Sequence, residues 1–178
     1  VLESWKDQAP TTHTVEVHLE AGKTYPVALE YYQNAGGALI QLAWQKPGAN
    51  MHAETMRAVA DADVIIFVGG ISPRFEGEEM GEQVQYEGFF RGDRTKITLP
   101  EVQTKLIREL YDMGKPVVLV IMSGSAVTVN WEDAHLPAIL QAWYPGQAGG
   151  QAIADVLFGR YNPAGRLPVT VYRSEEDL

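Results

Sequence analysis

The first part of the chain alternates apolar and polar side chains in a way that predicts β-strands. In residues 13–45, the stretch HTVEVHLEA places Val15, Val17 and Leu19 on one face. The runs YPVALEYYQ and ALIQLAW predict two more strands, separated by the turn-forming segments AGKTY and NAGG. Three antiparallel strands are too few to bury two faces. They therefore predict either an edge sheet that needs a partner or the end of a larger sandwich.

After Gly48 the pattern changes to alternating strands and helices. The runs VIIFVGG and VVLVIM are continuously apolar, which is typical of strands covered on both faces. The segment LPEVQTKLIRELYDMGKP predicts a helix, because Pro100 stands at its start and Gly114 and Pro116 follow its apolar stripe. MHAETMRAVADAD and GGQAIADVLFG predict two further helices. LPAILQAWYPG and RLPVTVY predict two further strands, the first after a short turn at WEDAH.

This order of elements predicts an α/β fold with a mainly parallel sheet layered with helices, in the manner of a flavodoxin-like sandwich. A short N-terminal antiparallel β segment precedes it. We expect two domains, residues 1–48 and residues 49–178, with the boundary near the KPGAN segment.

Composition excludes several classes of function. A formal net charge of −9 and the absence of a basic run argue against a nucleic-acid partner. The apolar runs are far too short to cross a bilayer, so no membrane partner is expected. The chain has no cysteine, and its four histidines show no metal-ligand spacing, so we expect neither a metal nor a cofactor. The opening VLESWKDQAP lacks a signal-peptide pattern and is expected to be internal to a longer protein.

An acidic loop follows the strand-like run VIIFVGG. Glu76, Glu78, Glu79 and Glu82 fall within a few positions, where ligands gather beyond the carboxyl ends of parallel strands. A carboxylic acid can act as a general acid near neutral pH if partial burial raises its pKa. A hydrated loop of exposed charges has the same spacing. The pattern alone leaves both interpretations open.

The loop before the best-marked helix offers a second group of polar residues. Asp93 or Thr98 is a candidate for capping that helix, and Arg94 for holding one of the loop carboxylates in a bidentate pair. These roles are structural rather than catalytic.

Nucleophilic and anion-binding sites find weaker support. Ser123 and Ser125 follow a predicted strand, but the spacing of a nucleophile elbow is missing, and His135 is the one histidine beyond residue 52. GGISPRFEG lacks the order of a phosphate loop. The glycines of PGQAGGQAIADVLFG are expected to allow a close approach between helix and sheet rather than to bind an anion.

Taken together and in this order, several segments resemble the C-terminal α/β domain of glycoside hydrolase family 3, the β-glucosidase and β-xylosidase family. The resemblance covers about residues 58–172 and rests on ADVIIFVGGISPRFEGEE, GDRTKITLPEVQTKLIREL, KPVVLVIMSGSAV, AILQAWYPGQAGGQAIADVLFG and NPAGRLPVTV. The segment GGISPRFEGEEM looks closer to the bacterial β-xylosidase-like branch than to plant exohydrolases. The first 48 residues are similar to the end of a protective-antigen-type β-sandwich insert, through EYYQ, NAGG and ALIQLAW.

The resemblance implies a retaining glycosidase in which an N-terminal (β/α)8 barrel supplies an Asp nucleophile and a loop of this domain supplies a Glu acid/base. Alignment from Gly70 onwards places the acid/base on Glu78. Glu76 is the second choice and Glu79 the third, because the stretch MGEQVQYEGFFRG lengthens the loop before the Asp-Arg pair of the family pattern.

The resemblance also implies the partners of this domain. They are a β-linked oligosaccharide or glycoside and the barrel of the parent chain, in a periplasmic or secreted protein. Phe75 or Tyr86 is a candidate for stacking on a sugar, and either can instead pack the loop onto its own domain. A lone acid forms no covalent intermediate, so the chain by itself is expected to be inactive.

Two other functions compete with this one. A non-catalytic carbohydrate-binding or interdomain module would leave the glutamates without a chemical role. A flavodoxin-like response module would need a phosphate or flavin site at the strand ends, and no phosphate loop is present in the sequence. A domain separated from its barrel would also expose an apolar patch and self-associate.

Overall fold

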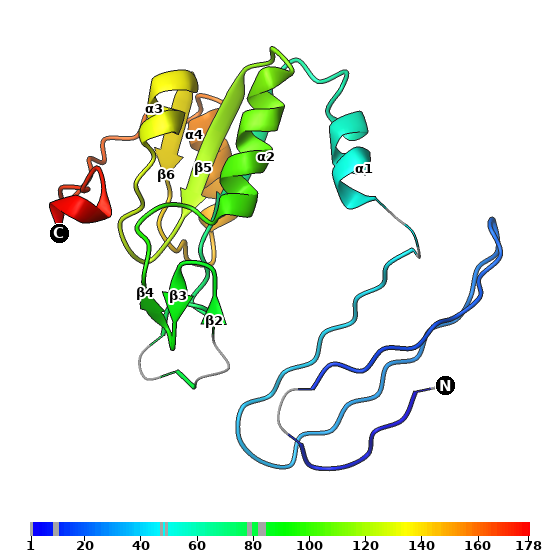
Figure 1. The fold of residues 1–178 in the computed structure, drawn as a ribbon. Coiled ribbons are helices and arrows are strands. Elements are labelled where there is room, and N and C mark those ends of the chain that lie inside the picture. The colour runs from blue at the N-terminus through cyan, green and yellow to red at the C-terminus, as the bar shows by residue number, and fades with distance from the viewer. Residues whose placement is uncertain (1, 9–10, 47, 49, 78–79, 82–84) are drawn as a thin grey trace. The chain divides into compact units, whose positions relative to one another are not determined.

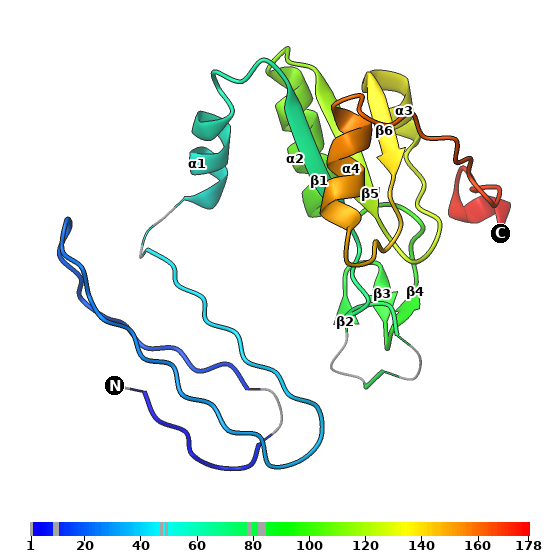
Figure 2. The same cartoon turned by 180° about the vertical axis from the view of Figure 1, so that it is seen from behind.

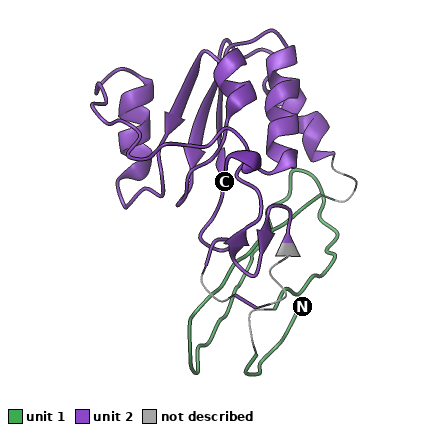
Figure 3. Ribbon diagram, turned by 60° about the vertical axis from the view of Figure 1, so that its left-hand side comes forward, with its two compact units in different colours: residues 1–49 green, residues 50–178 purple. Residues whose placement is uncertain are grey.

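The computed structural model divides the chain into two compact units, Val1–Ala49 and Asn50–Leu178 (Figure 3). This division falls one residue after the boundary expected from the sequence. The structure describes residues 2–8, 11–46, 48, 50–77, 80–81 and 85–178.

The second unit is built on a parallel sheet of order β1-β5-β6. The strands are β1 (Ile65–Gly70), β5 (Val117–Met122) and β6 (Ala138–Gln141). β1 pairs with β5 from Ile65 opposite Val117 to Gly70 opposite Met122, and β6 lies on the other side of β5. The prediction of a mainly parallel α/β fold is therefore confirmed, with β5 as the central strand.

Helices cover both faces of this sheet. α2 (Glu101–Asp112) and α3 (Asn130–His135) lie on one face, and α4 (Gly149–Leu157) lies on the other (Figures 1 and 2). α1 (Met51–Ala58) precedes β1, and a 3-10 helix, η1 (Glu175–Asp177), ends the chain.

The core lies between the sheet and the α2 face. Val117 and Leu119 of β5 and Ile107 of α2 have no exposed surface, and Leu110 of α2 is 2% exposed. The apolar stripe of α2 produces this contact, because residues three and four apart share one face of a helix. Burial of each such side chain contributes about 1.5–3 kcal/mol, so the α2–β5 contact is a rigid base for the loops that follow the strands.

A second, smaller sheet is antiparallel and has the order β2-β3-β4. Its strands are β2 (Gln85–Tyr86), β3 (Phe89–Phe90) and β4 (Asp93–Arg94). Arg91 and Gly92 connect β3 to β4 with φ angles of 54° and 96°. Positive φ at both central residues is the mark of a type I′ hairpin turn.

β1 forms the edge of the parallel sheet. Ile66 and Val68 are 42% and 53% exposed. At the end of the strand, the Gly70 N–H donates to Oε1 of Gln103 over 2.8 Å, and Nε2 of Gln103 donates to the Gly70 carbonyl over 2.7 Å. The side-chain amide of Gln103, from α2, therefore satisfies both backbone groups of the last residue of β1.

Three predicted elements differ from the structure. The described residues of the first unit contain no strand, and the antiparallel pairing lies instead at β2-β3-β4. Residues 166–172 also form no strand. At the end of that segment, Oγ1 of Thr128 donates to the Tyr172 carbonyl, and Nδ2 of Asn130 donates to the Arg173 carbonyl one residue further on. The predicted turn at WEDAH is helix α3.

In the part of the chain that the structure describes, no helix combines the length and the apolar character that a membrane crossing requires.

Candidate functional site

The loops that leave the three parallel strands bring their polar residues to one edge of the sheet. Glu76 follows β1, Ser125 follows β5 and Tyr144 follows β6, and Arg94 of β4 joins them. The carboxyl ends of neighbouring parallel strands meet at one edge, so residues far apart in the sequence converge there.

The carboxylate of Glu76 accepts two hydrogen bonds. The hydroxyl of Ser125 donates to its Oε1, and the phenol of Tyr144 donates to its Oε2 over 2.9 Å. Both oxygens are therefore engaged by groups of the same domain. Each oxygen thereby uses one of its two lone pairs on a neighbour in its own domain.

Arg94 holds the serine of this pair in place. Its Nη1 donates to Oγ of Ser125 over 2.8 Å and to the Ala126 carbonyl over 3.1 Å, while Nη2 and Nε donate to the carbonyls of Thr98 and Lys96. Burial lowers the pKa of Arg94, and the nearby Glu76 carboxylate opposes that effect. The expected bidentate pair with a loop carboxylate is not seen among the described residues, where Arg94 reaches Glu76 through Ser125.

Tyr144 is fixed as a hydrogen-bond donor. Burial and the hydrogen bond to Glu76 raise the pKa of Tyr144 to about 12, so the phenol keeps its proton throughout the physiological range. A Cβ at Gly124 would lie 2.6 Å from the Tyr144 ring and 3.0 Å from Oε2 of Glu76. Any larger residue where the loop after β5 passes this pair would therefore force Tyr144 or Glu76 to shift.

Ser123 has a structural role. It is fully buried; its hydroxyl donates to the Ser125 carbonyl over 2.7 Å and accepts from Nε2 of Gln141 over 2.9 Å. His135 lies on α3, where it stacks on Trp131 and donates through Nδ1 to that residue's carbonyl. No hydrogen bond between His135 and either serine is seen among the described residues, so His135 does not act as their general base here. This agrees with the missing nucleophile elbow.

The acidic loop is held again a few residues beyond Glu76. A Cβ at Gly92 would lie 1.8 Å from the Gly77 carbonyl oxygen, so these two glycines are in close contact. The Met80 N–H donates to the Arg91 carbonyl over 3.0 Å. The β3–β4 turn thus supports the loop at Gly77 and Met80, on either side of residues 78 and 79 in the chain.

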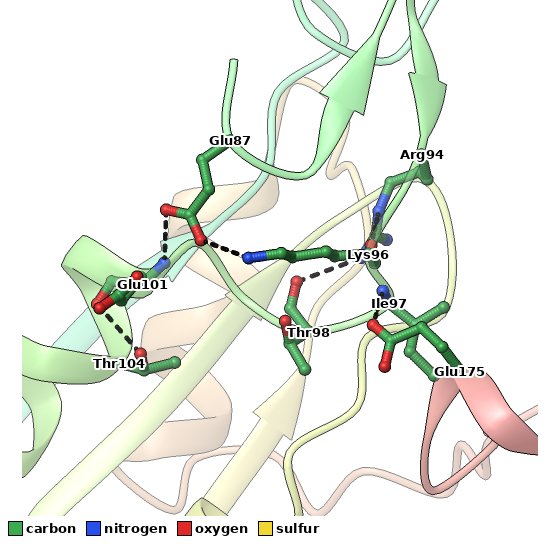
Figure 4. A network of polar contacts seen from close by, with 8 residues as sticks. All are labelled: Glu87, Arg94, Lys96, Ile97, Thr98, Glu101, Thr104 and Glu175. Atoms are coloured by element: carbon green, nitrogen blue, oxygen red, sulfur yellow. Dashed lines mark hydrogen bonds and ion pairs between the residues drawn. The ribbon is translucent and has the colours of Figure 1, made fainter.

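A more exposed polar network flanks the site (Figure 4). Oε1 of Glu87 accepts from Nζ of Lys96 over 3.1 Å, and its Oε2 accepts from the backbone N–H of Glu101 over 3.1 Å. These bonds lower the pKa of Glu87, the Lys96 bond having the larger effect. Glu87, rather than Asp93 or Thr98, therefore supports the first turn of α2, whose N-cap residue Pro100 has no side-chain cap.

The end of the chain joins the same network. Oε1 of Glu175 accepts from the Ile97 N–H over 3.0 Å, as Figure 4 also shows, and this backbone bond is the main cause of the lowered pKa of Glu175. The Thr128 N–H donates to the Ile97 carbonyl over 2.8 Å. Residue 97 is thus held from both sides, three positions beyond Arg94.

The two predicted sugar-stacking residues contact each other. The rings of Phe75 and Tyr86 are 4.6 Å apart and tilted by 58°, and Phe75 also lies 5.9 Å from Phe89. Such tilted contacts pack the loop onto the small sheet. Tyr86 remains 54% exposed and so keeps surface available to a ligand.

Of the predicted catalytic residues, the structure places Glu76 in the network described above. Glu78 and Glu79 lie outside the described residues.

The glycines of PGQAGGQAIADVLFG were expected to let α4 approach the sheet. A Cβ at Gly149 would lie 2.3 Å from Cβ of Pro145 in the preceding loop, and a Cβ at Gly146 or Gly150 would meet nothing within 4 Å.

Tyr144 and the Ser125–Glu76 contact were not predicted from the sequence. These residues lie 68 and 49 positions from Glu76, and neither belongs to a recognisable catalytic motif. The one available signal was their position at strand ends, since Ser125 follows a predicted strand and Tyr144 lies near the end of the predicted strand LPAILQAWYPG.

Within the described residues, no group of three or more His, Asp or Glu side chains is arranged to hold a metal ion.

Comparison with known proteins adds a family match over nearly the whole chain. The model of the glycosyl hydrolase family 3 C-terminal domain matches residues 2–178. A xylan 1,4-beta-xylosidase of Xylanibacter ruminicola is 41% identical over 172 residues, which are 96% of this chain and 20% of that protein. A periplasmic beta-glucosidase of Salmonella typhimurium is 42% identical over 121 residues, 68% of this chain and 14% of that protein. The chain spans about a fifth or less of the length of these relatives.

Solved structures show the same similarity. A family 3 exo-beta-xylosidase, XlnD, in complex with a xylobiose aziridine activity-based probe aligns with a TM-score of 0.59 and 37% identity, covering 70% of this chain and 15% of that one. A family 3 beta-glucosidase of Bifidobacterium adolescentis aligns with a TM-score of 0.60 and 31% identity, covering 71% of this chain and 17% of that one.

Proposed function

This chain belongs to the glycosyl hydrolase family 3 C-terminal domain family, and we propose that it supplies the acid/base half of a retaining, exo-acting β-glycosidase. The relatives that match it are named as β-xylosidases and β-glucosidases, so terminal β-linked xylosides or glucosides are the proposed substrates. The partner domain is a (β/α)8 barrel that carries an Asp nucleophile, as the family resemblance implies.

The observation that carries this proposal is the doubly anchored acidic loop. Ser125 and Tyr144 bind Glu76 at the carboxyl edge of the sheet, and the β3–β4 turn binds the loop again at Met80. A solvated loop without function needs no such fixation, whereas a general acid must be held within hydrogen-bond reach of the oxygen that it protonates.

We assign the general acid/base to Glu78. Both oxygens of Glu76 already accept hydrogen bonds from its own domain, so Glu76 is the anchor and not the acid. Glu78 is two positions further along the chain, between the anchored residues Glu76 and Met80. In the proposed mechanism it protonates the departing glycosidic oxygen and then removes a proton from the attacking water. The nucleophile and this acid act about 5–5.5 Å apart across the bond.

Other parts of the proposal concern binding and location. Tyr86, which is half exposed beside the loop, is the better candidate for stacking on a sugar in the leaving-group subsite. A periplasmic relative supports a periplasmic or secreted parent. The unit of residues 1–49 is proposed to be part of a protective-antigen-type insert.

The test is Glu78→Gln in the complete enzyme that carries this domain. The rate on xylosides or glucosides with poor leaving groups should fall about 10²–10⁴-fold, because they require protonation. With dinitrophenyl glycosides, the rate of the glycosylation step should fall much less. In a second variant, Glu78→Ala, added azide should restore turnover. Glu54→Gln, on α1, is a matched control that should change neither rate.

An unchanged rate in Glu78→Gln would remove the acid/base assignment and favour a non-catalytic binding or interdomain module. The isolated chain should not hydrolyse nitrophenyl xyloside or glucoside, because it has no partner to form the covalent intermediate. Turnover by the pure chain would contradict the division of roles between two domains.

A further inference from the structure

We propose that Glu76 is a positioning residue for the acid/base loop, and that the hydroxyls of Ser125 and Tyr144 act through it. This inference rests on the proposed function, since it names what holds the acid in place. It assigns a role to three side chains that bind one another through the Glu76 carboxylate.

The first argument is the origin of the three groups. Glu76, Ser125 and Tyr144 come from the loops after β1, β5 and β6, which are the three strands of the sheet. One carboxylate therefore ties together the ends of all three strands. A loop that is bound in this way takes its position from the sheet, whose central strand β5 is packed into the core.

The second argument is the direction of the hydrogen bonds. Toward the Glu76 carboxylate Tyr144 donates, because burial and the bond to Glu76 raise the pKa of its phenol and keep it protonated. Ser125 accepts from Nη1 of Arg94, so its own hydroxyl proton is directed to Glu76. The carboxylate is thus the common acceptor of two fixed donors, and such bonds to a charged group are among the stronger ones in proteins.

The third argument is the space around the carboxylate. Gly124 passes so close to Tyr144 and Glu76 that a Cβ would force them to move. Gly92 makes an even closer contact with the carbonyl of Gly77, the residue after Glu76. Two glycines in different loops therefore permit the backbone to approach on either side of this anchor.

The consequence for catalysis is geometric. Two residues of extended chain span at most about 7 Å, so an anchored Glu76 limits where the carboxyl group two positions later can go. A displacement of about 1 Å in a reacting group can cost about 10²-fold in rate. Loss of the Tyr144 phenol should therefore reduce catalysis without any contact between Tyr144 and the sugar.

The experiment compares Tyr144→Phe with Tyr161→Phe in the complete enzyme. Tyr161 is 63% exposed and serves as the matched control. For Tyr144→Phe we expect kcat/KM on an alkyl glycoside to fall about tenfold or more. On a dinitrophenyl glycoside, whose dinitrophenolate departs without protonation, kcat/KM should fall about threefold or less. Ser125→Ala should show the same selective loss, and Ser125→Thr, which keeps a hydroxyl, should recover most of it.

Equal losses on both substrates would overturn the positioning role, because a purely structural defect lowers the amount of active enzyme and not its leaving-group preference. No loss on either substrate would also overturn it. Glu78→Gln, measured in parallel, separates this failure from a failure of the proposed function. If Glu78→Gln shows the selective loss and Tyr144→Phe does not, only the positioning inference fails. If Glu78→Gln does not show it, the proposed function fails, and the inference with it.

Discussion

Two polar networks meet at the segment that follows β4, and they differ in burial. The inner one joins Glu76, Ser125, Tyr144 and Arg94 and is partly buried. The outer one joins Glu87 to Lys96 and to the Glu101 N–H. It also joins Glu175 to the Ile97 N–H, and it is exposed to solvent.

The difference in burial indicates which network fixes the site. Water and salt screen charges at the surface, so exposed ion pairs contribute little to stability, whereas partly buried hydrogen bonds to a charge cannot be replaced by water without rearrangement. We therefore expect the inner network to determine the position of the loop. The outer network should make only a small contribution to the stability of the segment between β4 and α2.

The change with the largest expected effect breaks the inner network by steric conflict. Gly124→Ala would place a Cβ 2.6 Å from the Tyr144 ring and displace it from Glu76. We expect a loss of about 1–3 kcal/mol in the free energy of unfolding, from thermal or denaturant unfolding, together with a loss of activity in the complete enzyme. Gly146→Ala is the matched control, since a Cβ there meets nothing within 4 Å. Equal stability of the two variants would contradict the close contact.

Removing one hydroxyl should have a smaller effect. Tyr144→Phe loses one hydrogen bond to Glu76 and should lower the free energy of unfolding by about 1 kcal/mol. Tyr161→Phe should be close to neutral. Denaturant titration of both variants measures this difference, and a neutral Tyr144→Phe would mean that the inner network adds nothing to stability.

The outer network should respond less to mutation and more to salt. Glu87→Gln weakens the contact with Lys96 and the support of the α2 N-terminus, and should lower the melting temperature by less than Tyr144→Phe does. The difference between wild type and Glu87→Gln should shrink as salt is added, because the pair is exposed. If the difference in melting temperature did not change with salt, Glu87 would behave like a partly buried residue of the inner network, and the prediction would be wrong.

The smallest expected effect is a pH dependence. The pKa values of Glu87 and Glu175 are both lowered from 4.5 in the folded protein. Their contribution is therefore fully present above pH 4.5 and is lost as the pH falls through the lower folded values. The melting temperature of wild type should approach that of Glu87→Gln/Glu175→Gln as the pH is lowered from about 7 to about 3. If the difference between the two melting temperatures grew on acidification, the lowered pKa values of Glu87 and Glu175 would be contradicted.

The elements that support the site were predictable because their signals are local. VIIFVGG and VVLVIM are continuously apolar and form β1 and β5, and Pro100 and Gly114 bracket α2 as expected. The alternation of Val15, Val17 and Leu19 carries the same kind of signal, yet these side chains are 52–65% exposed and no strand forms there. An alternating face becomes a strand only where a packing partner covers it.

The polar contacts of the site were not predictable, because each joins residues distant in the sequence. Asp93 and Thr98 stand just before α2 and fit a capping pattern, but Glu87, fourteen positions before Glu101, takes that place. Arg94 was expected beside a carboxylate and instead binds Ser125 and three carbonyls. Spacing identifies residues that are able to form such bonds, and the tertiary fold decides which partner comes within reach.

The amide of Gln103 has a consequence for any enlargement of the parallel sheet. It occupies the N–H and C=O of Gly70 that point away from β5, which are the groups that an additional neighbouring strand would use at that level. A further strand laid against β1 could therefore form ladder bonds with the backbone of Ile66 and Val68 but would have to end before Gly70. The side chain of Gln103 thus prevents an additional strand from pairing with β1 as far as the start of the acidic loop.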